Sequence, residues 1–201
     1  MAPARPKPAA AARGSGRLRI IGGQWRSRRI EFAAAAGVRP TADRIRETLF
    51  NWLRDVIPGA RCLDLYAGSG ALGFEALSRG AHRVVFVDQD VRVIQQLQAN
   101  AELLGTQGAE IVWSEALEYL ADCRSGPFDV VFLDPPFRDD VIAEACLRLE
   151  RYGLLSSPAW IYLETDQRRP PPGLPDNWRR LHEKTAGQVA YRMARRDAVA
   201  G

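Results

Sequence analysis

From Arg61 to Leu163, short apolar segments alternate with segments of helical periodicity, and this rhythm constrains the fold more than any other feature. The expected strands are 62–65, 83–87, 110–113, 128–133 and 160–163, and the expected helices are 71–78, 91–104, 116–123 and 141–152. Two further segments, 178–184 and 189–195, are expected to close the sheet as an antiparallel pair. The sequence therefore predicts an α/β fold with a doubly wound, mostly parallel seven-stranded sheet, Rossmann-like in type.

The chain ahead of this region is expected to divide into a tail and a small extension. Residues 1–16 are rich in Pro, Ala and Gly and predict a disordered basic tail. Residues 17–58 predict an N-terminal β-hairpin, with strands 17–21 and 28–32, followed by a helix. Residues 59–197 then form the main domain.

The positive charge of the chain is concentrated at its N-terminal end. Eight of the 28 basic residues lie in the first 30 positions, where no acid occurs, so the rest of the chain carries 20 basic and 24 acidic residues. Such an arm is typical of contact with phosphates, although a solvated tail is the better interpretation of residues 1–16. The hairpin residues that are candidates to contact a phosphate-bearing partner such as RNA are Arg17, Arg19, Trp25, Arg26, Arg28 and Arg29.

Composition excludes several other classes of protein. No apolar stretch is long enough to cross a bilayer, and no apolar segment near the start resembles a secretory signal. Cys62, Cys123 and Cys146 are widely spaced, and His82 and His182 belong to no ligand-like cluster, so neither disulfides nor a protein-bound metal are expected. A reducing, cytoplasmic location is the expectation.

A glycine-containing turn follows the first strand of the alternating region. Gly68 and Gly70 allow a ligand to approach the backbone closely, and Asp88 ends the next strand, where an acid commonly binds ribose hydroxyls. Because Gly73 completes a G-x-G-x-x-G pattern, a dinucleotide site is an alternative. Asp64 favours a cationic ligand instead, since its carboxylate would repel a pyrophosphate. S-adenosylmethionine, which carries an ammonium and a sulfonium, is the ligand predicted.

The buried strand 128–133 delivers a second group of functional residues to the same edge, namely Asp134, Pro135, Pro136 and Phe137. A carboxylate and a proline-fixed carbonyl can each accept one hydrogen of an amino group, while the phenylalanine ring offers a face for a base. These four residues are the expected catalytic residues. In the next turn, Glu115 and the Ala116 amide can reach an adenine, although Glu115 serves equally well as an acid at a helix N-terminus.

Together, residues 64–70 and 134–137 resemble those of class I, S-adenosylmethionine-dependent amino-methyltransferases. The longer segments 22–26, 39–53 and 186–192 are similar to the bacterial RsmD family, the 16S ribosomal RNA (guanine-N2)-methyltransferases. The resemblance implies methylation of the exocyclic N2 of one guanine in small-subunit ribosomal RNA, free or within an assembling subunit. The family usually has Asp where this chain has Glu115. The full set of residues expected at the cofactor is Arg39, Pro40, Thr41, Asp64, Tyr66, Ala67, Gly68, Gly70, Asp88, Gln89, Glu115 and Ala116.

Other activities remain open at this point. A DNA adenine-N6 methyltransferase would use the same chemistry but normally needs a separate target-reading region. A protein-glutamine methyltransferase generally carries Asn in place of Asp134 and needs no basic arm. A nicotinamide-dependent oxidoreductase fits the glycines but leaves Asp64 unexplained. A non-catalytic RNA-binding protein fits the basic arm but would not need the predicted cofactor pocket.

Overall fold

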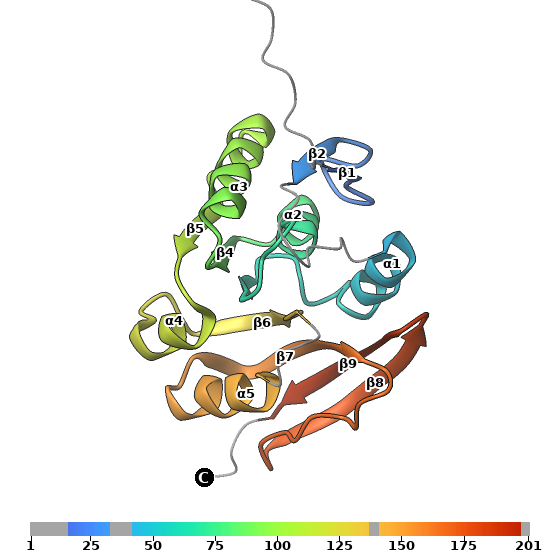
Figure 1. Ribbon diagram of the computed structural model, residues 1–201, viewed down its shortest axis with the longest axis vertical. Coiled ribbons are helices and arrows are strands. Elements are labelled where there is room, and N and C mark those ends of the chain that lie inside the picture. The colour runs from blue at the N-terminus through green and yellow to red at the C-terminus, as the bar shows by residue number, and fades with distance from the viewer. Residues whose placement is uncertain (1–15, 33–41, 137–140, 198–201) are drawn as a thin grey trace, which may run out of the picture.

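A seven-stranded sheet forms the centre of the computed structural model, which describes residues 16–32, 42–136 and 141–197 (Figure 1). The strands follow one another across the sheet in the order β5-β4-β3-β6-β7-β9-β8. The first five of these are parallel, and β9 pairs antiparallel with both β7 and β8. Their bounds are β3 Arg61–Asp64, β4 Arg83–Asp88, β5 Ala109–Trp113, β6 Phe128–Leu133, β7 Leu155–Asp166, β8 Trp178–Ala186 and β9 Val189–Arg196.

Helices cover both faces of this sheet, as the alternating pattern predicts. Their bounds are α1 Asp43–Trp52, α2 Ala71–Ser78, α3 Val91–Leu104, α4 Ala116–Asp122 and α5 Ile142–Arg151. On one face α1, α2 and α3 pack around Phe50, Phe74 and Leu97, and on the other α4 and α5 pack around Leu120 and Leu149. Figure 1 shows α4 and α5 side by side on their face.

The N-terminal hairpin forms a separate two-stranded antiparallel sheet, β1 Gly16–Arg19 and β2 Arg29–Phe32. Ile20 and Ile30 are fully buried and join the core on the side of α2 and α3. The hairpin therefore packs against the main domain through its apolar residues, beside α3 in Figure 1. The division of the chain at residues 16 and 58 stays a prediction.

The predicted fold class is confirmed, and the main difference concerns one strand. β7 begins at Leu155 rather than at residue 160, and its register against β6 shifts between Phe128 and Val130. The polar residues Ser156 and Ser157 and the following Pro158 obscure this first part in the sequence, because proline cannot donate to a strand ladder and is unusual within one. The predicted residues 160–163 are those paired with β6 in continuous register, and β7 continues beyond them to Asp166 against β9.

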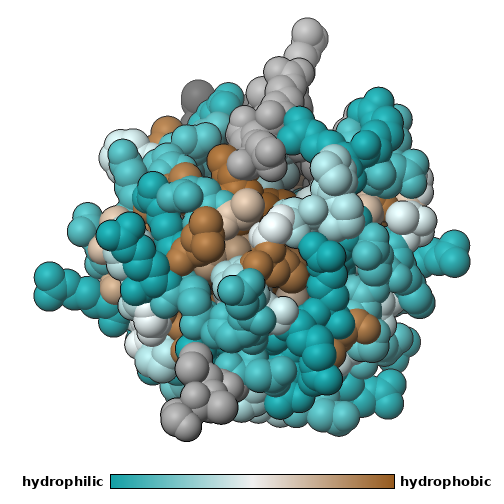
Figure 2. Space-filling model, turned by 90° about the horizontal axis from the view of Figure 1, so that it is seen from below, coloured by the Kyte–Doolittle hydropathy of each residue, from teal (hydrophilic) through white to brown (hydrophobic). Residues whose placement is uncertain are grey.

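None of the helices in the described ranges is long and apolar enough to span a bilayer. The face in Figure 2 is mostly hydrophilic and carries separate apolar patches, as ordinary protein surfaces do.

Candidate active site

Three aspartates come together where neighbouring parallel strands end. Asp64 ends β3, Asp88 ends β4 and Asp134 directly follows β6. In the sheet β3 lies between the other two strands, and Asp64 pairs in register with Phe132, two residues before Asp134. Asp134 and Asp88 both act electrostatically on the Asp64 carboxyl group. The glycine turn and the Asp-Pro-Pro corner thus open at the same edge of the sheet, where ligands bind in folds of this type.

Asp64 is buried beneath the turn. Its side chain is 2% exposed, and its carboxylate accepts the backbone N–H of Gly73 at 3.0 Å. Burial raises the pKa of Asp64 well above its ordinary value, and the negative charges of Asp134 and Asp88 raise it further, against the opposing effect of the Gly73 hydrogen bond. A cation bound beside Asp64 would reverse this effect by favouring the carboxylate form.

The glycines of the turn have different physical roles. Gly70 is the N-cap of α2 and has a φ of +72°, and a Cβ there would lie 2.6 Å from Leu97. Gly73 lies within α2, where a Cβ would lie 2.2 Å from the Phe86 ring on β4. The first substitution would strain the backbone, and the second would separate the helix from the sheet. Gly73 therefore has a packing role rather than a direct ligand role.

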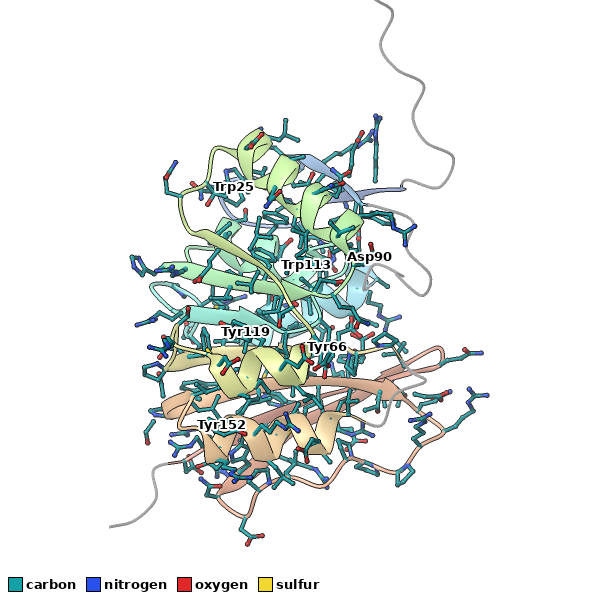
Figure 3. All side chains as sticks on the ribbon, turned by 60° about the vertical axis from the view of Figure 1, so that its left-hand side comes forward. Trp25, Tyr66, Asp90, Trp113, Tyr119 and Tyr152 are labelled. Carbon is teal, nitrogen blue, oxygen red and sulfur yellow. The ribbon has the colours of Figure 1, made fainter. Side chains whose placement is uncertain are left out.

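Asp88 ties the turn to the next strand. One carboxylate oxygen accepts the N–H of Gly68 and the other accepts the N–H of Asp90, both at 2.9 Å. Partial burial raises the pKa of Asp88, whereas these backbone hydrogen bonds lower it. Because each carboxylate oxygen can accept more than one hydrogen bond, Asp88 retains the capacity to bind ribose hydroxyls. Figure 3 places Tyr66, in the same turn, and Asp90 toward this edge of the sheet.

The adenine side of the predicted pocket is formed by the ends of β4 and β5. Gln89 is exposed, and its carbonyl accepts the indole N–H of Trp113 at 2.9 Å. Glu115 is the N-cap of α4, and its carboxylate accepts the N–H of Glu118 at 2.9 Å. The helix-capping role of Glu115 is thus present in the structure, and its contact with the adenine stays a prediction. Ala116, the first residue of α4, is buried.

The predicted acceptor corner is only partly within the described residues. Asp134 is half-buried, Pro135 is buried and Pro136 is exposed. Phe137 lies outside the described residues, as do Arg39, Pro40 and Thr41 from the predicted cofactor set. Among the described residues, no group of three or more His, Cys, Asp or Glu side chains is placed to hold a metal.

The hairpin residues predicted to contact RNA differ in their accessibility. Arg17, Arg19, Arg26, Arg28 and Arg29 are exposed. Trp25 was expected to present its ring near the turn, but it is 8% exposed and belongs to the core below the hairpin (Figure 3). The expectation that Trp25 contacts RNA is therefore corrected, because its ring stabilises the hairpin instead.

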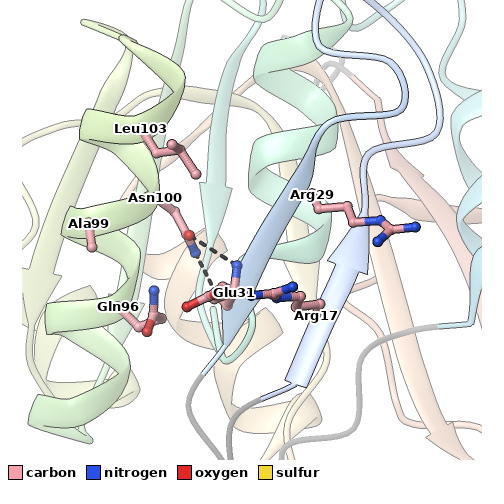
Figure 4. Close-up of a pocket in the computed structure, with 7 residues that line it drawn as sticks. All are labelled: Arg17, Arg29, Glu31, Gln96, Ala99, Asn100 and Leu103. Atoms are coloured by element: carbon pink, nitrogen blue, oxygen red, sulfur yellow. Dashed lines mark hydrogen bonds and ion pairs between the residues drawn. The ribbon is translucent and has the colours of Figure 1, made fainter. Parts of the chain in front are cut away.

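A small cleft lies between this hairpin and α3, away from the aspartates (Figure 4). The Asn100 side chain fixes one wall, accepting the N–H of Glu31 at 3.2 Å and donating to the Glu31 carbonyl at 2.6 Å. Arg17 forms an ion pair with the Glu31 carboxylate at 2.9 Å. The cleft has a volume of about 390 Å³ and is lined by Arg17, Arg29, Glu31, Gln96, Ala99, Asn100 and Leu103.

Sequence reasoning missed the residues that hold the hairpin on the main domain. Glu75 of α2 is fully buried, and its two carboxylate oxygens accept the N–H groups of Ile21 and Gly22, each at 2.8 Å. Ser78, one turn later, accepts the N–H of Trp25 at 2.9 Å and donates to the Gly22 carbonyl at 2.6 Å. An acid within an otherwise apolar helix was the available signal for Glu75.

Comparison with known proteins agrees with this geometry. A family model described as "Conserved hypothetical protein 95" matches residues 18–195. "Ribosomal RNA small subunit methyltransferase D" of Escherichia coli K12 is 49% identical over 185 residues, covering 92% of this chain and 93% of that protein. The protein of the same name from Haemophilus influenzae is 45% identical, covering 89% and 93%. The chain belongs to the family of ribosomal RNA small subunit methyltransferase D.

A solved structure supports membership of this methyltransferase D family. The structure described as "Putative methyltransferase yhhF from Escherichia coli" superposes with a TM-score of 0.84 at 48% identity, covering 92% of this chain and 100% of that chain. The structure described as "Crystal structure of SMU.776, a putative methyltransferase complexed with SAH" has a TM-score of 0.68 at 15% identity and shares the fold. The family resemblance and the class I methyltransferase fold predicted from the sequence are thereby confirmed.

Proposed function

We propose that this protein transfers a methyl group from S-adenosylmethionine to the exocyclic N2 amine of a guanine in 16S ribosomal RNA. The observation that carries the proposal is that Asp134 and the buried Asp64 lie at the ends of adjacent parallel strands, at one edge of the sheet. The names of the relatives support ribosomal RNA as the substrate class. The guanine N2 position rests on the resemblance of the sequence motifs.

The residues of the glycine turn fit a cationic nucleoside. Asp64 offers a carboxyl group to positive charge, and Asp88 offers carboxylate oxygens to ribose hydroxyls. Gly68 and Gly70 leave the backbone accessible between these two acids. When bound, S-adenosylmethionine supplies a methyl group already activated by attachment to a positively charged sulfur. We include Arg39, Pro40 and Thr41 at the border of this pocket on the sequence motif alone.

Asp134 has the principal role on the acceptor side. A guanine amine is a weak nucleophile, and it gains positive charge as it attacks the methyl carbon. The Asp134 carboxylate accepts one N–H and stabilises that charge, while the Pro135 carbonyl accepts the other N–H. Holding the amine in line with the methyl group lowers the barrier by up to roughly 7–11 kcal/mol in favourable cases. Phe137 stacks on the base, a contact typically worth roughly 1–3 kcal/mol.

The exposed hairpin arginines form the proposed RNA-binding surface. A base must leave its stack to reach the sheet edge, so the target is a guanine in a loop or a splayed strand. Arg17, Arg19, Arg26, Arg28 and Arg29 then hold the flanking phosphates. The substrate is 16S RNA, either free or in an assembling small subunit.

The proposal is tested by incubating the protein with labelled S-adenosylmethionine and either free 16S RNA or small subunits from a strain lacking this protein. Nucleoside mass spectrometry should detect N2-methylguanosine at one position, and Asp134→Ala should reduce transfer by orders of magnitude while cofactor affinity is kept. A methylated adenine, methylation of protein only, or binding of NAD in preference to S-adenosylmethionine would each refute the proposal.

A further inference from the structure

A second carboxyl group lies beside Asp134 at the edge of the sheet. Leu133 of β6 pairs with Leu163 of β7, so Asp134 and Glu164 occupy the next positions on two adjacent parallel strands. Phe132 and Tyr162, two residues earlier, point to the α1–α3 face with ring centroids 6.5 Å apart. Since side chains alternate along strands, Glu164 points to this face as well.

Glu164 is buried and held by a tyrosine. It is 5% exposed, and the hydroxyl group of the fully buried Tyr162 donates to its Oε2 atom at 2.8 Å. Burial raises the pKa of Glu164 to about 8, and the negative charge of Asp134 contributes to this rise, whereas the Tyr162 hydrogen bond lowers it. The two neighbouring acids therefore favour a state with one proton and one negative charge at neutral pH.

The other charged groups on this face do not change the state in which Glu164 and Asp134 share one proton and one negative charge. Lys184 on β8 lies over the Trp52 ring of α1, with its Nζ 5.9 Å from the ring centroid. Asp166, two residues along β7, is paired with Arg168. Among the described residues of the neighbouring strands, the titratable and charged groups that share this face with Glu164 are Asp134 directly after β6, Tyr162 and Asp166 on β7, Tyr191 on β9, and His182 and Lys184 on β8.

We propose that Glu164 is a positioning residue that remains a neutral carboxylic acid and holds the Asp134 carboxylate toward the acceptor amine. This inference rests on the proposed function. The amine nitrogen forms its bond to the methyl carbon, the bond from that carbon to sulfur breaks with its electron pair left on sulfur, and one N–H proton passes to Asp134 and then to water. Glu164 keeps its proton throughout and acts as a hydrogen-bond donor to Asp134. Ionisation of Glu164 removes this donor and places a like charge beside Asp134.

The first test compares the pH dependence of kcat for the wild type and Glu164→Gln. A glutamine amide can donate a hydrogen bond but does not titrate in this range. The wild type should lose activity above about pH 8, where Glu164 ionises, whereas Glu164→Gln should remain active and lose this decline. Glu102→Gln, at an exposed site on α3, should keep the wild-type profile. An unchanged alkaline decline in Glu164→Gln would overturn the inference.

The second test requires no turnover. In protein with 13C-labelled glutamate carboxyl groups, NMR titration of the full chain should detect one carboxyl group with a midpoint near pH 8, absent in Glu164→Gln. Asp134→Asn should move that midpoint to lower pH, because it removes a negative charge next to Glu164. A titration near pH 4.5, or one that Asp134→Asn leaves unmoved, would overturn the inference even if Glu164→Gln failed to fold.

The two proposals fail in different ways. If Asp134→Ala abolishes transfer but Glu164→Gln keeps the alkaline decline, only the role of Glu164 is wrong. If Asp134→Ala retains transfer, the role of Asp134 in the proposed function is wrong, and the role of Glu164 fails with it.

Discussion

Gly22, in the turn of the N-terminal hairpin, donates its backbone N–H to the buried Glu75 carboxylate on α2 at 2.8 Å. The helix that carries Glu75 has its N-cap at Gly70, in the turn predicted to hold the cofactor. Arg46 of α1 also reaches Glu75, with its guanidinium 3.5 Å from the carboxylate. One side chain thus connects the hairpin, α1 and the helix behind the cofactor turn.

Glu75→Ala should lower the free energy of unfolding by about 3–5 kcal/mol, the range for removing one partner of a buried ion pair. Two backbone N–H groups of the hairpin and the buried Arg46 guanidinium would lose an acceptor. Urea unfolding followed by circular dichroism measures the change. Glu102→Ala, at an exposed site, should stay within about 0.5 kcal/mol of the wild type. Equal effects of the two substitutions would contradict this role of Glu75.

Asp64 should couple cofactor binding to proton release. Its pKa is raised by burial, so the group holds its proton more strongly before a cation arrives and releases it when positive charge binds. Affinity for S-adenosylmethionine should therefore decrease as pH falls, approaching about tenfold per pH unit where Asp64 is protonated.

Calorimetry in two buffers of different ionisation enthalpy measures the released protons. Asp64→Asn should bind more weakly and release fewer protons, while Asp90→Asn, at the N-cap of α3, should keep the wild-type proton release. Binding by the wild type without proton release would rule out the role of Asp64.

RNA affinity should depend on salt through the hairpin. Arg26 and Arg29 are exposed, and no ion pair of either is recorded within residues 16–32, 42–136 and 141–197, so both are available to phosphates. Replacing both with Ala should reduce the slope of log affinity against log salt by up to about 2, roughly 1 for each phosphate contact. Filter binding across a salt series checks this slope. Arg151→Ala, on α5 at the other face, should leave it unchanged, and a wild-type slope in the double variant would exclude these contacts.

Local patterns in the sequence were sufficient to predict the sheet. β6 is apolar at every position except Asp129, as expected of a buried parallel strand, and α3 shows its helical period plainly, so both were predicted with exact bounds. The positions of Asp64, Asp88 and Asp134 at one edge of the sheet were predictable for the same reason, since each is the last residue of an identifiable strand or directly follows one. That Asp64 and Asp134 lie near each other follows from the strand order of the fold.

Tertiary contacts decided what the sequence did not predict. Trp25 has the same local context whether its ring faces RNA or the core, and only the packing of the hairpin on α2 distinguishes the two. Glu164 stands at the end of a strand like many exposed acids, and its burial depends on neighbouring strands far away in the chain. The role of Glu75 could not be predicted from its local sequence, because the hairpin residue that donates a hydrogen bond to it lies more than 50 residues earlier.

Glu164 should also make the native state less stable as pH rises. Its pKa in the folded protein is raised from 4.5 to about 8, so between these values the folded state binds more protons than the unfolded state. The stabilising contribution is complete below about pH 4.5 and is lost as pH rises toward 8. The slope of the free energy of unfolding for one group approaches about 1.4 kcal/mol per pH unit in this window.

Urea unfolding between these pH values should show the wild type losing stability relative to Glu164→Gln, whose side chain does not titrate. Because Asp64 contributes in the same direction in both proteins, the difference between them isolates Glu164. Parallel stability curves would mean that Glu164 is ionised in the native protein at neutral pH.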